Sequence, residues 1–219
     1  MGDTGLDAAC DFSSAGYWEE RYRGGGTSGA GSYGRLAAFK AAFVNGFVAA
    51  NAISRVIEFG CGDGNQLGLL SVPRYTGVDV SPTILARCRT RFPHYVFVDP
   101  AELADMPPAE LGLSMDVVFH LIEDAVFADY MRTLFWHATD YVIIYSSNCD
   151  LRTPDRHVRH RPVSDYVRRT FPEWSLRAFV PNPYPFDPTH PQDTSFADFM
   201  VFGRARHECR LMIPGAAPC

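Results

Sequence analysis

Hydrophobic positions first follow a helical spacing along the chain and then change to short apolar runs. In the segment 36–51, hydrophobic side chains recur every three or four residues, at Leu36, Phe39, Phe43, Phe47 and Ala50. This spacing predicts an amphipathic helix. From Arg55 onward, short apolar runs alternate with helical segments, which is typical of a parallel sheet built from crossover units.

The alternation predicts seven strands and four further helices. Strands are expected at 55–59, 74–80, 95–98, 115–121, 141–145, 174–180 and 196–203. Helices are expected at 65–70, 82–92, 124–139 and 162–171. Ser81 and Pro82 favour the start of the second of these, because serine caps helices and proline suits the first turn. The fold class expected is α/β, with a mostly parallel seven-stranded sheet, helices on both faces and an antiparallel last strand.

Length and composition are those of one globular domain with short additions. The 219 residues are too few for two ordinary domains. We expect flexible ends at 1–16 and 214–219, an N-terminal helical and glycine-rich segment at 17–51, and the main domain at 52–213. The formal net charge of -5 argues against a nucleic-acid partner. The sequence has neither a signal peptide nor a long apolar run, which predicts a cytoplasmic protein without a membrane partner.

A glycine-rich turn follows the first expected strand. It reads Glu58-Phe59-Gly60-Cys61-Gly62-Asp63-Gly64-Asn65, and its glycines allow the backbone to approach a flat ligand closely. Asp79 ends the second strand, where a carboxylate can accept from both hydroxyls of a ribose. Asp99 follows the third strand, at a place suited to an adenine amino group. These residues predict a nucleoside-shaped pocket at the carboxyl ends of the strands.

An acid followed by alternating glycines, with acids ending the next two strands, resembles the class I S-adenosylmethionine (SAM)-dependent methyltransferase family. The resemblance runs from Arg55 to Tyr145 and, more weakly, to Gly203. It implies a Rossmann-like fold, SAM as methyl donor and S-adenosylhomocysteine (SAH) as product. It also implies that the glycine turn surrounds the methionine part of SAM, Asp79 the ribose and Asp99 the adenine. The cofactor-binding residues expected are Glu58, Gly60, Cys61, Gly62, Asp63, Gly64, Asn65, Asp79, Val80, Asp99 and Pro100.

A nicotinamide-dinucleotide site is the nearest alternative. Such sites use G-x-G-x-x-G, whereas Asn65 stands here in place of the third glycine. Glu58 would also face a negative pyrophosphate in that case, while SAM carries an ammonium and a sulfonium. Charge therefore favours SAM. An NAD(P)-dependent oxidoreductase and a noncatalytic SAM-binding protein remain as alternatives.

In the family, the end of the fourth strand lies opposite the transferring methyl group. His120 falls there and is the first candidate for contact with the methyl acceptor and for removal of its proton. In the alternative interpretation, His120 donates to a backbone carbonyl and only shapes the pocket. Asp116 is interpreted as serving the entry of this strand. The glycine-rich segment 24–34 is either a lid over the SAM pocket or a passive loop.

A basic segment, 152–161, follows the fifth strand and is unusual in an acidic chain. Arginines match carboxylates and phosphates, so it could bind an acidic acceptor; the alternative is a solvated loop paired with nearby acids. The spacing of His157 and His160 suits a metal, but no third ligand is evident, and no metal is expected. The acceptor-binding residues expected are His120, Asn148, Arg152, His157, His160, Arg161 and Tyr184. Packing in the proline-rich loop 181–186 is the alternative role of Tyr184.

The function expected is transfer of a methyl group from SAM to an oxygen or nitrogen atom of a small-molecule acceptor. A sugar, a nucleotide-linked compound or a secondary-metabolite precursor would fit, and an acidic one if the basic segment binds it. The chain has no Asn-Pro-Pro-Tyr sequence like that of enzymes that methylate nucleic-acid amino groups. This absence favours small acceptors.

Overall fold

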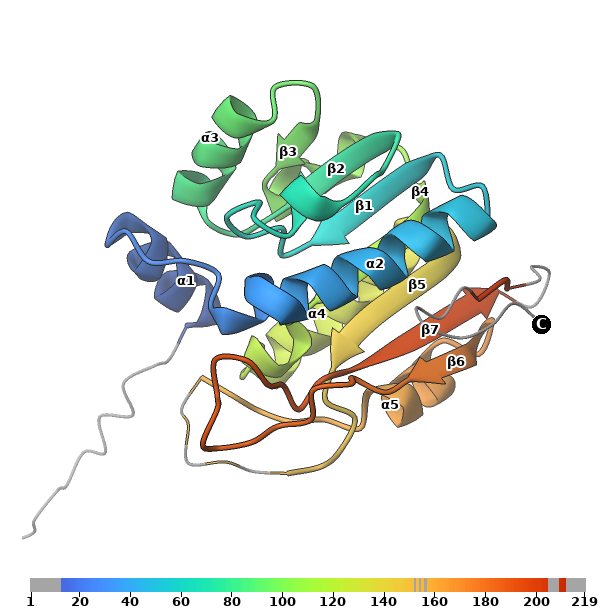
Figure 1. Ribbon diagram of the computed structural model, residues 1–219. Coiled ribbons are helices and arrows are strands. Elements are labelled where there is room, and N and C mark those ends of the chain that lie inside the picture. Colours follow the sequence, from blue (N-terminus) through green and yellow to red (C-terminus); the bar gives the residue numbers. More distant parts are fainter. Residues whose placement is uncertain (1–12, 152, 154, 156, 205–208, 212–219) are drawn as a thin grey trace, which may run out of the picture.

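A computed structural model describes residues 13–151, 153, 155, 157–204 and 209–211. Its centre is a seven-stranded sheet in the order β3-β2-β1-β4-β5-β7-β6 (Figure 1). The strands are β1 (Arg55–Phe59), β2 (Arg74–Val78), β3 (Val96–Val98), β4 (Ala109–Met115), β5 (Ala138–Ser146), β6 (Trp174–Val180) and β7 (Asp198–Arg204). Strands β1 to β5 pair in parallel, whereas β7 runs antiparallel to both β5 and β6. The mostly parallel sheet with an antiparallel last strand is thus confirmed.

Helices cover both faces of the sheet. They are α1 (Ser14–Arg23), α2 (Gly34–Ala50), α3 (Pro82–Arg91), α4 (Asp124–Trp136) and α5 (Val163–Thr170). Four short 3-10 turns complete the elements, at η1 (Ala30–Ser32), η2 (Leu67–Leu69), η3 (Pro100–Asp105) and η4 (Val118–His120). In Figure 1, α2 crosses the front of the sheet, α4 lies behind it, and α1 lies on the side toward which β1 and β5 point.

The core has one layer on each side of the sheet because successive side chains of a strand point to opposite faces. Ile143 of β5 packs in the cluster that includes Phe43 and Phe47 of α2. Its neighbours Val142 and Ile144 pack in the other cluster, with side chains of α4 and α5. All three are fully buried, as expected for an interior strand of a sheet with helices on both faces.

The fourth strand does not lie where the hydrophobic pattern places it. The expectation was 115–121, whereas β4 ends at Met115. Gly112 and Glu110 interrupt the apolar pattern of the true strand and hide it. Asp116 then adopts a left-handed backbone with φ of 59°, a conformation that aspartate tolerates better than most residues and that ends the strand. The interpretation of Asp116 as serving the strand's entry is therefore wrong, because it lies just beyond the carboxyl end.

Two further differences concern the N-terminal half. The helix expected at 65–70 is reduced to the single turn η2. Helix α1 begins at Ser14, inside the segment 1–16 for which flexibility was expected, and Ser13 caps it by accepting from Gly16 N. Residues 1–12 and 214–219 lie outside the described residues. Among the helices described, none has the length and apolar character needed to cross a membrane.

Candidate functional site

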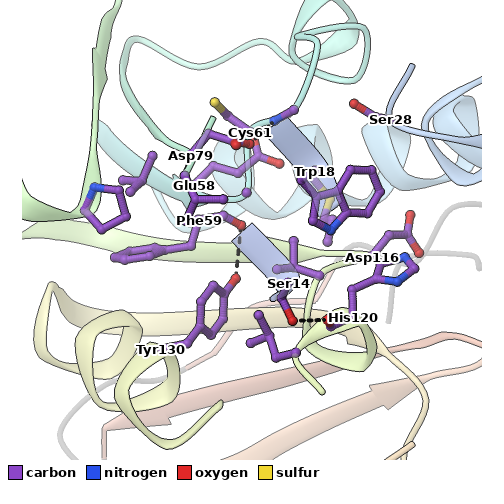
Figure 2. A pocket seen from close by; sticks show the side chains of 18 of the residues that line it. Ser14, Trp18, Ser28, Glu58, Phe59, Cys61, Asp79, Asp116, His120 and Tyr130 are labelled. Carbon is purple, nitrogen blue, oxygen red and sulfur yellow. Dashed lines mark hydrogen bonds between the residues drawn. The ribbon is translucent and has the colours of Figure 1, made fainter. Parts of the chain in front are cut away.

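A cavity of about 330 Å³ opens at the carboxyl ends of β1, β2 and β4. Seven of the eleven cofactor-binding residues expected from the sequence line it, namely Glu58, Gly60, Cys61, Gly62, Asp79, Val80 and Pro100. Figure 2 shows Glu58, Cys61 and Asp79 on one side of the cavity and Trp18, Asp116 and His120 on the other. The site thus has a wall formed by the glycine turn and an opposite wall formed by α1 and the end of β4.

The glycine turn adopts a backbone that side chains would prevent. Gly60 and Gly62 have φ of 77° and 56°, in the left-handed region. A Cβ at Gly60 would lie 2.3 Å from Cγ2 of Val117, and one at Gly62 would lie 2.3 Å from Oγ of Ser28. These glycines therefore provide both the turn and the close approach of the segments around the cavity.

Asp79 ties the turn to the end of β2. Its Oδ2 accepts from Gly62 N at 3.0 Å, and its Oδ1 accepts from Ser81 N at 3.0 Å. Burial raises the pKa of this carboxyl to about 6, although the backbone hydrogen bonds oppose the shift. Each carboxylate oxygen can accept more than one hydrogen bond, so acceptor capacity remains for a ligand in the cavity.

Glu58 is a buried carboxyl at the same wall, 3% exposed. Its Oε2 accepts from the Tyr75 hydroxyl. Burial raises its pKa to about 7, while the Tyr75 hydrogen bond and the charge of Lys40 act in the opposite direction. A cation bound in the cavity would favour the ionised form of Glu58.

The other four expected cofactor residues do not line the cavity. Asp63 accepts from Ser28 N at 2.8 Å and from the Tyr33 hydroxyl at 2.7 Å, and Asn65 Nδ2 donates to Ser32 O at 2.7 Å. Both residues therefore fasten the glycine-rich segment to the turn. A Cβ on Gly64 would lie 2.7 Å from the Phe92 ring, away from the cavity. The Asp99 carboxylate caps η3 by accepting from Ala101 N.

Helix α1 and the glycine-rich segment cover the cavity. Six of their residues line it, namely Ser14, Ala15, Trp18, Tyr22, Ser28 and Ser32. The Glu19 carboxylate accepts from the hydroxyls of Ser81 at 2.5 Å and Thr83 at 2.6 Å, which attaches α1 to the start of α3. This segment is held by hydrogen bonds on several sides, as a closed lid would be.

His120 lines the cavity with one ring nitrogen already engaged. Its Nδ1 lies 2.8 Å from the His157 carbonyl oxygen, which can only accept, so Nδ1 carries the proton. No hydrogen bond to Nε2 is found within the described part of the chain. Burial lowers the pKa of the ring to about 4, although the charge of Asp116 opposes the shift. His120 is thus a neutral imidazole with Nε2 able to accept a proton. Its ring hydrogen-bonds to a backbone carbonyl, as the alternative interpretation expects, and its contact with the acceptor stays a prediction.

Lys40 and Asp116 form an ion pair at the cavity wall that sequence reasoning missed. Lys40 is 1% exposed, and both residues line the cavity. One signal was available: Lys40 stands four residues after Leu36 and three before Phe43, on the apolar stripe of the predicted helix. A lysine in that stripe must find a buried partner. The partner, Asp116, was not recognised because the fourth strand was expected at 115–121 and not at Ala109–Met115.

Five of the other six acceptor residues expected from the sequence are described, and none of the five lines the cavity. Asn148 accepts from Ser164 N at 2.9 Å, at the start of α5. His160 Nδ1 lies 2.7 Å from Ser147 Oγ, and Tyr184 lies beneath the Arg35 guanidinium. The His157 ring stacks on that of His120, and Arg161 donates to the backbone carbonyls after His120. Arg152 lies outside the described residues. The described residues contain no group of three possible metal ligands.

No family model matches the chain. A 67-residue stretch is 43% identical to a trans-aconitate 2-methyltransferase of Methylobacterium nodulans and covers 27% of this chain. The match spans about a quarter (26%) of the length of that curated relative.

Solved structures are similar over most of the chain. The SAM-bound magnesium protoporphyrin IX methyltransferase of Synechocystis PCC 6803 has a TM-score of 0.62 and 13% identity, over 89% of this chain and 98% of its own. The methyltransferase domain of bacterial CtHen1-CN has a TM-score of 0.58 and 20% identity, over 77% of this chain and 100% of its own. The SAH-bound N-methyltransferase NodS of Bradyrhizobium japonicum WM9 has a TM-score of 0.59 and 14% identity, over 74% of this chain and 84% of its own. The chain therefore has the class I SAM-dependent methyltransferase fold.

Proposed function

We propose that the protein is a SAM-dependent methyltransferase that acts on an oxygen or nitrogen atom of a small molecule. The observation that carries the proposal is the cavity itself. In a class I methyltransferase fold, a left-handed glycine turn, the Asp79 carboxylate and the neutral His120 imidazole line one space at the carboxyl ends of the strands. When bound, SAM supplies a methyl group already activated by the sulfonium.

The donor wall fits the chemistry of SAM in three respects. The turn at Gly60 and Gly62 leaves space that a Cβ would fill, which suits a ligand in close contact with the backbone. Glu58 would hold the ammonium group of the methionine part, because a cation there compensates the burial of its carboxylate. Asp79 would accept from the ribose hydroxyls with its remaining lone pairs.

The opposite wall would hold the acceptor and remove its proton. Methyl transfer is an in-line displacement, so the nucleophile must be held close and aligned. An acceptor hydroxyl or amine that donates to Nε2 of His120 would lose its proton to the neutral ring as the new bond forms. Trp18 lies edge-on to the ring, with centroids 5.1 Å apart, and would help to exclude water.

The cationic groups at and near the cavity already have partners within the protein. Among the described residues that line the cavity, Lys40 is the one lysine or arginine, and its ammonium is paired with Asp116. The guanidinium of Arg161 donates to two backbone carbonyls and to Asp124. These contacts favour the interpretation in which the basic segment pairs with nearby groups of the protein. A dinucleotide is disfavoured because its pyrophosphate would meet the carboxylates of Glu58 and Asp79.

Calorimetric titration with SAH tests the donor site. We expect Asp79→Ala to weaken SAH binding by about 30-fold or more, since hydrogen bonds to a charged group contribute roughly 1.5–3 kcal/mol each. Asp105→Ala is the matched control, because this aspartate is exposed and does not line the cavity. Unchanged affinity in Asp79→Ala, or binding of NAD and not SAH by the wild type, would contradict the proposal.

Incubation with methyl-labelled SAM and a panel of sugars, nucleotides and amino acids tests the reaction. Mass spectrometry should show the gain of one methyl group on one class of compound. Binding of SAH without transfer to any acceptor would favour the noncatalytic alternative.

A further inference from the structure

The segment that carries His120 depends on other parts of the chain for its hydrogen bonds. Residues 119–122 run from the last two residues of η4 toward the start of α4. They are not part of a sheet or a longer helix, so their carbonyl groups need partners from elsewhere. All four carbonyls accept a hydrogen bond from a distant residue. His120 O accepts from Ser14 Oγ at 3.0 Å, and the other three accept from two arginines that follow β5.

Arg159 and Arg161 supply these bonds. Arg159 donates from its backbone N to Phe119 O at 2.7 Å and from Nη1 to Ile122 O at 3.1 Å. Arg161 donates from Nη1 to Leu121 O and from Nη2 to Ile122 O at 3.0 Å. One planar guanidinium therefore holds the two carbonyls that directly follow His120.

The position of Arg161 makes it rigid. The residue is 8% exposed, and its guanidinium lies over the Phe127 ring, 4.4 Å from the centroid. Nη2 also lies 3.1 Å from the Asp124 carboxylate. Because the guanidinium is planar, contacts on its face and at both ends fix its orientation as well as its place.

The same stretch of chain also fixes the ring of His120. His157 O accepts from Nδ1, and the His157 ring stacks on that of His120 with centroids 5.6 Å apart. Trp18 faces the ring from α1, and the titratable and charged groups that act on it are His157, Asp116 and Arg21. The backbone after His120 and the hydrogen bond to its ring are thus set by residues 157–161.

We propose that Arg161 is a positioning residue for His120. By holding Leu121 O and Ile122 O, it keeps the His120 ring in register with His157 O, so that Nε2 remains the nitrogen that can accept a proton. Arg159 assists through Phe119 O. The part of this inference that concerns catalysis rests on the proposed function, whereas the part that concerns the ring does not.

Nuclear magnetic resonance of the histidine ring nitrogens tests the placement directly, with His120→Asn used to assign the signals. In the wild type saturated with SAH, His120 should show a single tautomer with the proton on Nδ1. In Arg161→Met we expect two tautomers in exchange and a ring pKa closer to its ordinary value of 6.5. Arg168→Met is the matched control, because Arg168 is exposed and pairs only with Asp165 among the described residues.

Kinetics separate positioning from general damage. In Arg161→Met, kcat for methyl transfer should fall about 100-fold, the size of effect that a misplacement of about 1 Å can cause. The Kd for SAH should stay within about threefold of wild type, because the donor wall is untouched. Arg161→Lys keeps the charge and a single donor nitrogen in place of the two that reach Leu121 O and Ile122 O, so its kcat should be about tenfold higher than that of Arg161→Met.

An unchanged tautomer and ring pKa in Arg161→Met would overturn the inference, as would a loss of SAH affinity equal to the loss of turnover. If Arg161→Met does not fold, the same criteria apply to Arg161→Lys. A wild-type protein that transfers no methyl group would contradict the proposed function, while the ring measurement would still decide the role of Arg161.

Discussion

The Lys40 ammonium and the Asp116 carboxylate form an ion pair in which Nζ and Oδ2 are 2.5 Å apart, although Lys40 is 1% exposed. The pair joins α2 to the end of β4, next to the glycine-rich segment. A Cβ on Gly31 would lie 2.6 Å from Asp116 Oδ2, so the cover of the cavity packs directly against the pair. Loss of either charge should therefore lower the stability of the protein and disturb the packing of the glycine-rich segment over the cavity.

Replacement of one member of this pair should be costly. Lys40→Met leaves the Asp116 carboxylate without its partner, and we expect the free energy of unfolding to fall by about 3 kcal/mol. This is the lower end of the usual range, because the Asp116 side chain is 16% exposed. Urea denaturation measures the change. The double variant Lys40→Met with Asp116→Leu should be more stable than Lys40→Met alone, and a double variant that is less stable would contradict the ion-pair interpretation.

Glu58 should make stability depend on pH in the direction opposite to that of most carboxylates. Its folded-state pKa of about 7 lies above the ordinary value of 4.5, so the folded protein binds more protons between these values. Stability is therefore lost as the pH rises from about 4.5 to 7. Glu58→Gln should remove this loss. The unfolding free energy of the variant minus that of the wild type should therefore be larger at pH 8 than at pH 5, as urea denaturation at both pH values would show. An equal pH dependence in both proteins would show that the Glu58 carboxyl does not have a raised pKa in the folded state.

His120 should act as a neutral base over a wide pH range. With a ring pKa of about 4, it stays unprotonated at neutral pH, and its contribution to turnover should be lost only as the pH falls through that value. His120→Asn should lower kcat by about 100-fold or more at neutral pH, the usual contribution of a general base, and leave the Kd for SAH nearly unchanged. Stopped-time assays with the identified acceptor measure this. An unaltered kcat would remove His120 from the reaction.

Gly62 and Gly25 provide a matched pair for testing the glycine turn. Both have positive φ, but a Cβ at Gly62 would collide with Ser28, whereas nothing lies within 4 Å of one at Gly25. Each change to alanine should cost about 1–2 kcal/mol of stability for the left-handed backbone. Gly62→Ala alone should also lose SAH affinity, measured by calorimetry. Similar affinities in the two variants would show that the close packing of Gly62 against Ser28 is not needed for binding.

Glu19 attaches α1 to the Ser81 and Thr83 hydroxyls. Glu19→Gln removes the charge that strengthens these bonds, and we expect SAH to dissociate several-fold faster, as measured by stopped-flow fluorescence of Trp18. Glu20→Gln is the control, since Glu20 is exposed on the same helix. Equal dissociation rates in the two variants would mean that this attachment does not retain the ligand.

Local patterns predicted much of the sheet and the donor wall. Glycines at 60 and 62, and an acid at 79, follow apolar runs with clear boundaries, so their place at the strand ends could be read from the sequence. The pairing of Lys40 with Asp116 could not, because it joins residues 76 apart and depends on where β4 ends. The contacts of Arg161 could not be predicted for a similar reason: its charge is compatible with an acidic ligand or with a nearby acid, and only the fold brings the carbonyls after His120 to its guanidinium.

Ser14 connects the covering helix to the acceptor side of the cavity. Its hydroxyl contacts both the carbonyl of His120 and the carboxylate of Glu123. Any movement that lifts α1 from the cavity would break both contacts and release the backbone at His120. A molecule with its cover raised would therefore lack a well-placed base, so proton removal would be restricted to the closed, water-excluding form, and the donor would be spared from wasteful attack by solvent.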